Sequence, residues 1–404
     1  MTVPLDWWSP SLKRGTGGCV PTTGGSHSSA SLVRSGVLER RIRRIVDSRF
    51  QEVQCGFRPG HETVDQLYTL SRVLEVAWEF AQPVYMCFVD LEKAFNCVPQ
   101  GVLWGVLREY GVLDPLIGAV RYDRRQSLVR IAGSKSDVFP VRVGLHQGCP
   151  LSPILFIIFM DRISRCSQGV EGVRFGDLRI GSLLFADDVV LLASSGHDLQ
   201  LLLDWFAAEW EAAGMKISTS KSETMVLSRK RVECPLRVRN EILPQVEEFK
   251  YLGGLFTSEG RMEREIDRRI GAASAVLRAL HRPVILKKEL SLIYWSIYVP
   301  TLTYGHELWV VTERTRLRIQ AAKMGFLRRV TGLSLRDRVR SSVIWEGLGV
   351  EPLLLRIEKS QVRWLWHLVS LVYFEHVRVL QQQDKSNNMK STCPKRSRMK
   401  HMLI

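Results

Sequence analysis

Three short apolar runs stand out along the chain because each has an acidic residue at or beside one end. The segment Ser182–Ala193 (SLLFADDVVLLA) contains two of these runs, rich in Val, Leu and Phe, on either side of Asp187 and Asp188. The third run, Val84–Leu91 (VYMCFVDL), carries Asp90 near its C-terminal end. Runs of this length and composition predict buried strands. The pattern therefore predicts a strand–turn–strand unit with an acidic turn, and a separate strand that ends in a carboxylate.

Helices and strands alternate in the expected structure up to about residue 257, and helices follow. Apolar positions at helical spacing, with a start signal at Ser152-Pro153 and a stop signal at Gly214, predict the helices of the first part. These helices cover residues 32–50, 64–80, 103–110, 154–163 and 199–213. Further strands are expected over 216–227 and 249–256, and a hairpin around residues 133–135. From Arg261 onward the spacing predicts helices over 266–280, 317–330 and 353–371.

Charge is the compositional feature that changes this picture. The chain has 404 residues, and its apolar fraction of 45% and charged fraction of 24% are ordinary for a globular protein. Its net charge of +16 is not ordinary. A field of this sign favours polyanions, most readily nucleic acid, and makes binding salt-dependent. The alternative is a basic protein that owes its charge to solubility or to a tail.

Cysteine spacing and the longest apolar runs bear on the compartment. The eight cysteines include no Cys-x-x-Cys pair, and no histidine stands at zinc-site spacing from one. This pattern favours a reducing compartment, the nucleus or the cytosol. The N-terminus has no signal-peptide pattern, and the longest apolar runs are well short of the ~20 residues that a spanning helix needs. We therefore expect a soluble protein that is not secreted and does not contact a membrane.

The acidic turn poses an electrostatic problem that a metal ion would solve. A charge among apolar strands is costly unless something compensates it, and Ser182–Ala193 contains no Lys or Arg. If the strand that carries Asp90 neighbours the strands around Asp187 and Asp188, three carboxylates converge. Such a trio can hold two Mg²⁺ ions ~3.5–4 Å apart for in-line displacement at phosphorus. The alternative is an ordinary turn whose carboxylates face water.

Ordered motifs then relate the chain to a known family. The segments Phe88–Phe95 (FVDLEKAF), Gly144–Pro153 (GLHQGCPLSP) and Phe185–Asp188 (FADD) resemble motifs A, B and C of reverse transcriptases, in the family's order. Gly214–Glu223 resembles motif D, and Phe249–Gly253 resembles motif E. Upstream, residues 54–60 (QCGFRPG) resemble the fingers segment just before motif A. The resemblance covers residues 33 to about 370 and is strongest to LINE-type retrotransposons, which lack long terminal repeats.

The resemblance implies a role for each matching residue. Catalytic, metal-binding roles fall to Asp90, Asp187 and Asp188, with Mg²⁺ as the cofactor (two ions) and Mn²⁺ as a substitute. Lys221 would donate a proton to pyrophosphate. The implied substrate-binding residues are Arg58, Leu91, Phe95, Gln147 and Gly148. Among these, Phe95 would exclude a 2′-hydroxyl and so favour dNTPs, although an ordinary core aromatic is the alternative, and Arg58 would contact template or nucleotide phosphates.

The implied fold is α+β, a right-hand polymerase fold with an antiparallel-sheet palm, truncated fingers and a helical thumb. We expect a disordered segment over 1–31, fingers and palm over 32–257, a helical thumb and C-terminal region over 258–380, and a basic disordered tail over 381–404. The first 30 residues are rich in Gly and Ser where the family has further fingers sequence, and we expect the endonuclease domain of many such elements to be absent. Asn96 stands where LINE-type enzymes commonly carry Asp. The sequence is therefore expected to be a truncated copy.

The implied function is RNA-directed DNA polymerisation, with an RNA template, a DNA primer and dNTPs as partners, in the nucleus or cytoplasm. The sequence does not specify an oligomeric state. One alternative is a catalytically decayed nucleic-acid-binding relic, which predicts salt-sensitive RNA binding without nucleotide addition. A second alternative is an RNA-templated RNA polymerase, which Phe95 disfavours.

Overall fold

The computed structural model describes residues 29–121, 126–127, 130–131, 134–135, 137, 139–140, 143–166, 172–175, 178–260, 262–279, 293–333 and 335–367. The expected tail over 381–404 and almost all of the expected segment 1–31 lie outside these residues. Two compact units divide the chain. The first contains the residues up to Phe50 and Lys93–Phe159, and the second contains Gln51–Glu92 and the residues from Met160 onward. Each unit therefore combines separate parts of the sequence.

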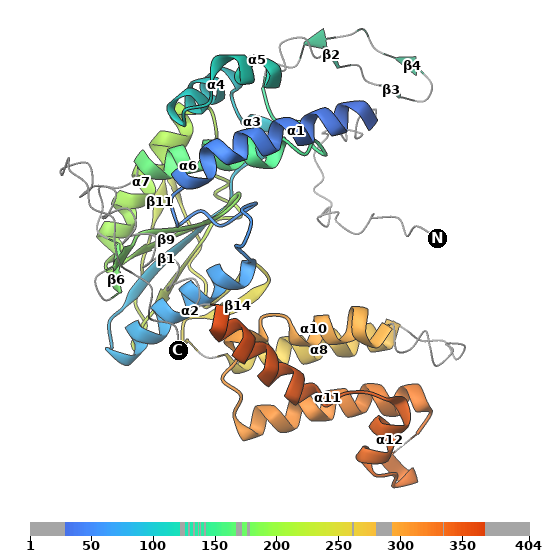
Figure 1. Cartoon of the computed structure of the whole chain (residues 1–404). Helices are drawn as coiled ribbons and strands as arrows, with labels where there is room; N and C mark the ends of the chain where they lie inside the picture. Colours follow the sequence, from blue (N-terminus) through green and yellow to red (C-terminus); the bar gives the residue numbers. More distant parts are fainter. Residues whose placement is uncertain are drawn as a thin grey trace, which may run out of the picture. The chain divides into compact units, whose positions relative to one another are not determined.

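A four-stranded antiparallel sheet is the centre of the second unit (Figure 1). Its strand order is β10-β1-β9-β8, and the bounds are β1 Val84–Val89, β8 Ser182–Phe185, β9 Asp188–Ala193 and β10 Glu223–Leu227. All three runs that were expected to be strands are therefore strands of one sheet. They are apolar on both faces because both faces of the sheet are covered by helices.

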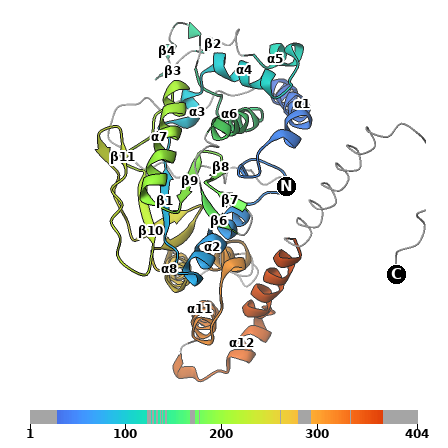
Figure 2. The same cartoon turned by 90° about the vertical axis from the view of Figure 1, so that its left-hand side faces the viewer.

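Helix α2 (Thr63–Glu79) covers one face of this sheet, and helix α7 (Gly196–Ala212) covers the other (Figure 2). The core on the α2 side includes Leu70 and Leu74 of α2 with Met86 and Phe88 of β1. The residues of β1 that alternate with these point to the opposite face, where α7 contacts β1 and β9.

Local capping signals explain where these two helices begin and end. Glu62 and Asp65 form a reciprocal capping box at the start of α2. At the start of α7, the Ser195 hydroxyl accepts a hydrogen bond from the Asp198 backbone N–H at 3.1 Å. Gly214, two residues after α7 ends, has a φ of +76°, the left-handed conformation that terminates helices.

Small hairpins complete the sheet structure of the second unit. They are β6 Val173–Phe175 with β7 Leu178–Ile180, β11 Arg237–Val238 with β12 Glu241–Ile242, and β13 Glu248–Tyr251 with β14 Gly254–Thr257. The last of these corrects the expectation of one strand over 249–256. The chain reverses there because Leu252 and Gly253 both have positive φ, +44° and +83°.

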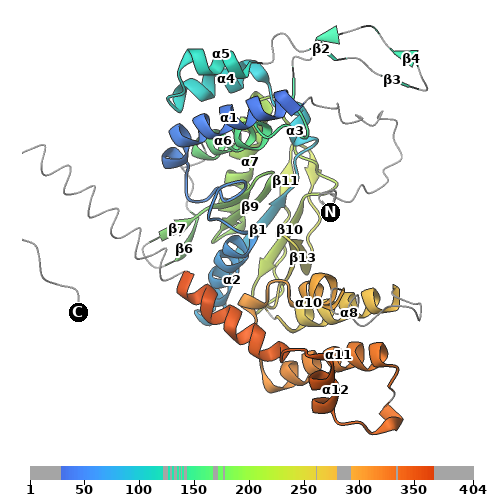
Figure 3. The ribbon, with the colours of Figure 1, turned by 45° about the vertical axis from the view of Figure 1, so that its right-hand side comes forward.

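The second unit continues into a helical region with its own core (Figure 3). The elements are α8 Glu263–Ala279, η2 Tyr294–Tyr298, α10 Val299–Thr303, η3 His306–Leu308, α11 Glu313–Thr331, η4 Leu335–Asp337, α12 Ser341–Leu348 and a helix over 353–367. Ile266 of α8, Tyr298, Phe326 of α11 and Ile344 of α12 belong to one buried cluster. The 353–367 helix returns to α2, where the Trp364 ring packs edge-on against the Tyr68 ring with 4.4 Å between the ring centroids.

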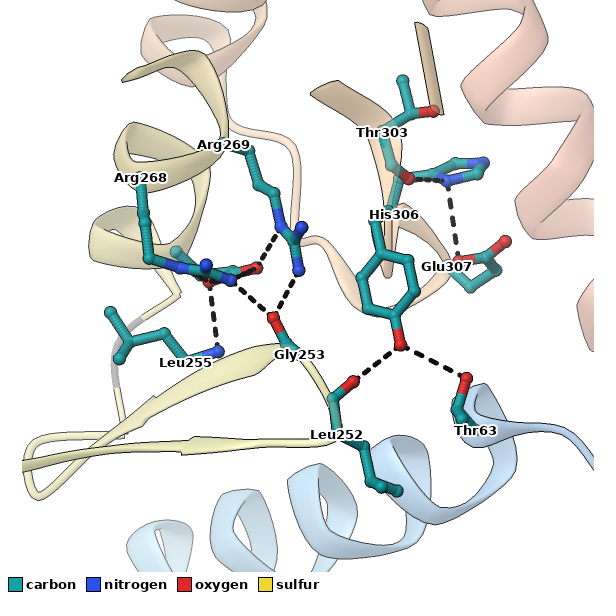
Figure 4. A network of polar contacts seen from close by, with 11 residues as sticks. Thr63, Leu252, Gly253, Leu255, Arg268, Arg269, Thr303, His306 and Glu307 are labelled. Carbon is teal, nitrogen blue, oxygen red and sulfur yellow. Dashed lines mark hydrogen bonds and ion pairs between the residues drawn. The ribbon is translucent and has the colours of Figure 1, made fainter. Parts of the chain in front are cut away.

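Buried ionic contacts join this helical region to the turn of the β13–β14 hairpin (Figure 4). Glu265 of α8 is 3% exposed, and its carboxylate accepts hydrogen bonds from Arg268 and Arg269 and from the Leu255 backbone N–H. Both arginines also donate to the Gly253 carbonyl oxygen. The turn is thereby held to α8 through charged groups.

The first unit is mainly helical in the residues that the structure describes. Its helices are α1 Ser29–Val46, η1 Asp47–Arg49, α3 Ala94–Cys97, α4 Gln100–Glu109 and α5 Asp114–Val120, and α6 Ser152–Cys166 begins in it. The expected hairpin is present as paired strands, β2 Gln126–Ser127 with β5 Phe139–Pro140 and β3 Arg130–Ile131 with β4 Ser134–Lys135. None of the helices described here is long and apolar enough to cross a membrane.

Candidate active site

Three carboxylates lie at the same end of two neighbouring strands. β1 and β9 are antiparallel, and Val89, the last residue of β1, pairs with Val189. Asp90 follows Val89, and Asp188 precedes Val189 as the first residue of β9. Asp187 belongs to the turn between β8 and β9. The condition for convergence, that these strands be neighbours, is therefore fulfilled.

The acidic turn is tight and conformationally strained. Phe185 pairs with Asp188, so the connection consists of Ala186 and Asp187 alone. Of the two, only Ala186 has a positive φ, +58°, which is the pattern of a type II′ hairpin turn. Glycine is the favoured residue at that position, and a residue with a Cβ costs about 1–2 kcal/mol there. The surrounding structure must therefore hold Ala186 in place.

The backbone around Asp90 is fixed by the loop that precedes β10. The Asp90 N–H donates to the Ser222 hydroxyl at 3.1 Å, and the Asp90 carbonyl accepts from the Ser218 N–H at 2.8 Å. One residue further on, the Leu91 backbone bridges to Ile217. Ser222 is fully buried. This loop is the segment that resembles motif D, and its hydrogen bonds fix the backbone position from which the Asp90 side chain extends.

The acids destabilise one another's charged forms. Burial raises the pKa of Asp188 to about 6, and the charges of Asp187 and Asp90 add to the rise. Burial also raises the pKa of Asp187, to which the charge of Asp90 contributes. Part of each side chain remains open to solvent, which leaves the site accessible to an ion or a substrate. A nearby positive charge would lower both pKa values.

Lys221 supplies one such positive charge. Its Nζ lies 3.5 Å from Asp90 Oδ1, and the two side chains are 67% and 43% exposed. An ion pair this exposed contributes little to stability. Its importance is chemical, because it brings an ammonium group to Asp90 from a segment 131 residues further along the chain.

The donor set suits a hard divalent cation, although the side chains are not already arranged around one. Three carboxylates at adjoining strand ends offer the oxygen ligands that Mg²⁺ and Mn²⁺ prefer. In the described part of the chain, no three Asp, Glu, His or Cys side chains stand as a ready-made metal cage. Rotation about the side-chain bonds of Asp90, Asp187 and Asp188 would be needed to bring their oxygens onto shared ions.

Arg58 and Leu91, two of the expected substrate-binding residues, make internal contacts in the second unit. Arg58 Nη1 donates to the backbone carbonyls of Gln51 at 3.0 Å and Gln54 at 2.9 Å. Leu91 is 6% exposed, so its side chain belongs to the core. Arg58 therefore shapes the loop in which it lies, and Leu91 contributes packing beside Asp90.

The other three expected substrate-binding residues belong to the first unit. The Phe95 ring stacks on Phe156 of α6 at a centroid distance of 4.1 Å, and the Phe95 carbonyl accepts from the Leu145 N–H at 2.8 Å. Gln147 and Gly148 are exposed in the loop that follows Leu145. Motifs A and B thus share backbone contacts within this unit.

Three residues that the sequence did not single out border the acids. Ser222 holds the Asp90 backbone, as described above. The Gln54 side-chain oxygen accepts from the Ala186 N–H at 3.1 Å. Tyr251 is 2% exposed, and its pKa is raised first by burial and then by the charge of Asp188. All three lie in segments that resemble family motifs, so membership of a motif was the available signal.

Comparisons with known proteins agree with this geometry. The family model described as reverse transcriptase (RNA-dependent DNA polymerase) matches residues 34–256, more than half of the chain. The chain therefore belongs to the reverse transcriptase family.

Individual relatives show which type of reverse transcriptase this chain resembles. The chain is 28% identical over 244 residues to the Retrovirus-related Pol polyprotein from type-2 retrotransposable element R2DM of Drosophila melanogaster, covering 56% of this chain and 23% of that protein. It is 26% identical over 347 residues to the RNA-directed DNA polymerase from mobile element jockey of the same organism, covering 80% and 37%. These relatives confirm the resemblance to LINE-type reverse transcriptases.

A solved structure of telomerase from Candida tropicalis, bound to a fragment of telomeric RNA, aligns with a TM-score of 0.46 at 12% identity, covering 75% of this chain and 46% of that one. The chain spans about a quarter to two fifths of the length of the two curated relatives described above.

Proposed function

We propose that this chain is an RNA-directed DNA polymerase that adds dNTPs to a DNA 3′-end on an RNA template. The observation that carries the proposal is the position of Asp90, Asp187 and Asp188 at adjoining ends of β1 and β9, with the Lys221 ammonium 3.5 Å from Asp90. Membership of the reverse transcriptase family supports the same chemistry.

Each group near the acids has a role in this proposal. Asp90, Asp187 and Asp188 would hold two Mg²⁺ ions, or Mn²⁺ in their place. When bound, the ions lower the pKa of the attacking 3′-hydroxyl and neutralise charge on the leaving pyrophosphate. Lys221 would donate a proton to pyrophosphate as a general acid. Arg58 would contact template or nucleotide phosphates, a role that the resemblance of residues 54–60 to the fingers segment implies.

The proposed nucleotide contacts of the first unit are those of Phe95, Gln147 and Gly148. Stacking on Phe156 restricts the Phe95 ring, and a restricted ring is what a steric gate against a 2′-hydroxyl requires. Gln147 and Gly148 would shape the nucleotide and template pocket. We place the protein in the nucleus or cytoplasm, because Cys55, Cys87, Cys149 and Cys234 are buried free thiols, which are typical of a reducing compartment.

The direct test is primer extension by the full chain on an RNA template, with dNTPs and Mg²⁺. We expect extension by the unaltered protein, and a loss of at least 1,000-fold in Asp187→Asn, in line with the size of electrostatic contributions to catalysis. Asp204→Asn, which changes an exposed acid on α7, is the matched control and should retain full activity. Extension by Asp187→Asn at the control rate would refute the assignment of the acids.

The nucleotide gate has a separate test in the same assay. Phe95→Val is expected to raise the ratio of rNTP to dNTP incorporation at least 10-fold, because the smaller side chain leaves room for the 2′-hydroxyl. An unaltered ratio would remove Phe95 from the nucleotide site. If the protein binds RNA in a salt-dependent manner but adds no nucleotide, the decayed-relic alternative is correct.

A further inference from the structure

We propose that Gln54 is a positioning residue of the acidic turn: its buried side-chain oxygen holds the Ala186 N–H, and thereby sets where Asp187 and Asp188 present their carboxylates to metal. The proposal deepens the proposed function and rests on it, since it treats these acids as metal ligands. Gln54 lies 30 residues before the start of β1 at Val84, in the segment that resembles the fingers.

The Gln54 side chain is directed at the turn by two hydrogen bonds. It is 0% exposed, and its Oε1 accepts from the Gly56 N–H at 2.9 Å and from the Ala186 N–H at 3.1 Å. A carbonyl oxygen has two lone pairs, so both are occupied. Ala186 is the strained residue of the turn, with its φ of +58°. The acceptor is therefore supplied at the position that most needs an external constraint.

The Gln54 backbone is fixed as firmly as its side chain. β8 is an edge strand of the sheet, and Gln54 forms a parallel bridge with its residue Leu184 on the outer side. The Leu184 N–H donates to the Val53 carbonyl at 2.9 Å, and the Cys55 N–H donates to the Leu184 carbonyl at 3.0 Å. Residues 53–55 thus extend the sheet by a short length of strand, which ends beside the turn.

Gly56 shows how closely this segment approaches the turn. A Cβ placed on Gly56 would lie 2.2 Å from the Ala186 nitrogen and 2.9 Å from the Ala186 Cα. Both are backbone atoms, so no rotation of a side chain could relieve the overlap. The contact between the 54–56 backbone and the turn therefore requires glycine at this position.

Metal binding is sensitive to this contact because the acids are displaced when the turn changes. Without the Gln54 oxygen, the Ala186 N–H loses its partner and the turn can relax toward a less strained conformation. Asp187 is the second residue of that turn and Asp188 follows it, so both carboxylates would move. Active sites lose much of their activity when supporting residues let them shift by about 1 Å.

Gln66 of α2 offers a matched control because it is a buried glutamine that contacts the 53–55 segment and has different partners. It is 2% exposed, and its Nε2 donates to the carbonyls of Val53 at 3.0 Å and Leu184 at 3.3 Å. These hydrogen bonds support the strand pairing, and neither acceptor belongs to the acidic turn. Gln54→Met and Gln66→Met remove the same amide at nearly constant volume, one from the turn and one from the strand.

The experiment measures Mn²⁺ binding to the full chain by electron paramagnetic resonance, together with melting temperature, kcat and dNTP KM for primer extension. In Gln54→Met we expect Mn²⁺ affinity to fall at least 10-fold and kcat to fall 10- to 100-fold, with KM changed less than threefold. Gln66→Met should lower the melting temperature by a comparable amount and change Mn²⁺ affinity and kcat less than threefold. Should Gln54→Met not fold, Gln54→Asn is the second variant, since its shortened amide cannot reach Ala186, and the same losses are expected.

The outcomes separate the inference from the proposed function. Equal effects of Gln54→Met and Gln66→Met on Mn²⁺ affinity would overturn the inference and leave the polymerase assignment standing. If the unaltered chain binds Mn²⁺ but extends no primer, the polymerase assignment fails. The Mn²⁺ affinities of the two variants, measured by electron paramagnetic resonance, then still test whether Gln54 positions the acidic turn. Absence of Mn²⁺ binding in the unaltered chain would overturn both.

Discussion

Asp188 is held in an environment that disfavours its charged form. Its pKa of about 6 lies above the value of about 3.9 that an unfolded chain gives an aspartate. Protonation therefore favours the folded state. This contribution to stability is fully present below about pH 4 and is lost as the pH rises through 6. At pH 7–8 the ionised carboxylate works against folding, which is the usual compromise of a site built to bind a cation.

Asp188→Asn is accordingly expected to stabilise the metal-free protein while abolishing nucleotide addition. The melting temperature at pH 8 should rise by roughly 1–3 °C, a modest gain because the side chain is partly open to solvent. The gain should shrink as the pH falls from 6 to 4, where the wild-type carboxyl is protonated in the folded state. Scanning calorimetry at pH 4, 6 and 8 without divalent metal tests this, and an unchanged or lower melting temperature at pH 8 would contradict it.

Lys221 is the residue whose chemistry, beyond its charge, matters to the proposed mechanism. Lys221→Arg keeps a cation near Asp90 but replaces a proton donor with a guanidinium that does not titrate. We expect kcat for dNTP addition to fall about 100-fold at pH 8 while KM changes less than threefold. The control is Lys216→Arg, which changes an exposed lysine of the same loop and should leave kcat and KM unchanged. Retention of kcat within threefold in Lys221→Arg would mean that charge alone suffices.

The β13–β14 hairpin shows how an element can depend on charged groups from another. Its turn residue Gly253 has its carbonyl bound by two arginines that are themselves held by buried Glu265 (Figure 4). The Tyr304 hydroxyl donates to the preceding carbonyl, that of Leu252, at 2.6 Å. The hairpin therefore cannot change its turn without disturbing α8 and the chain around Tyr304.

Glu265→Gln tests this dependence. The arginines would lose their charged partner in a nearly buried setting, and we expect the free energy of unfolding in urea to fall by about 2–4 kcal/mol. Asp267→Asn removes an acid from the same helix that pairs with Arg318 at the surface, where both side chains are about 40% exposed. That control should cost less than about 0.5 kcal/mol. Similar losses in the two variants would show that burial of the Glu265 network contributes nothing.

The whole molecule carries a net charge of +16, and this charge determines how the proposed template should bind. Each phosphate neutralised by Lys or Arg releases condensed counterions, so affinity falls steeply with salt. Affinity for an RNA–DNA primer–template is expected to drop at least about 100-fold between 50 and 200 mM KCl, measured by fluorescence anisotropy. The melting temperature over the same range serves as the control against unfolding. A drop of less than threefold would argue against a phosphate-dominated interface.

Local patterns in the sequence were sufficient for the parts of the fold that depend on neighbours along the chain. Helices α2 and α7 begin at capping residues and bury an apolar face, and both were expected within a few residues of their bounds. β1, β8 and β9 are apolar runs of strand length. The hairpin turn at Leu252 was missed because its first left-handed residue is a leucine, which carries no turn signal.

The sequence by itself determined the residues that carry the chemistry: three acids at the ends of apolar runs, in motifs that recur in order. Only the tertiary structure decided what holds them. The Ser222 hydroxyl on Asp90 and the Gln54 oxygen on Ala186 each join residues 132 positions apart. Strand pairing and folded loops create such contacts. No periodicity along the chain encodes them, because a hydrogen bond between distant segments depends on the packing of everything between them.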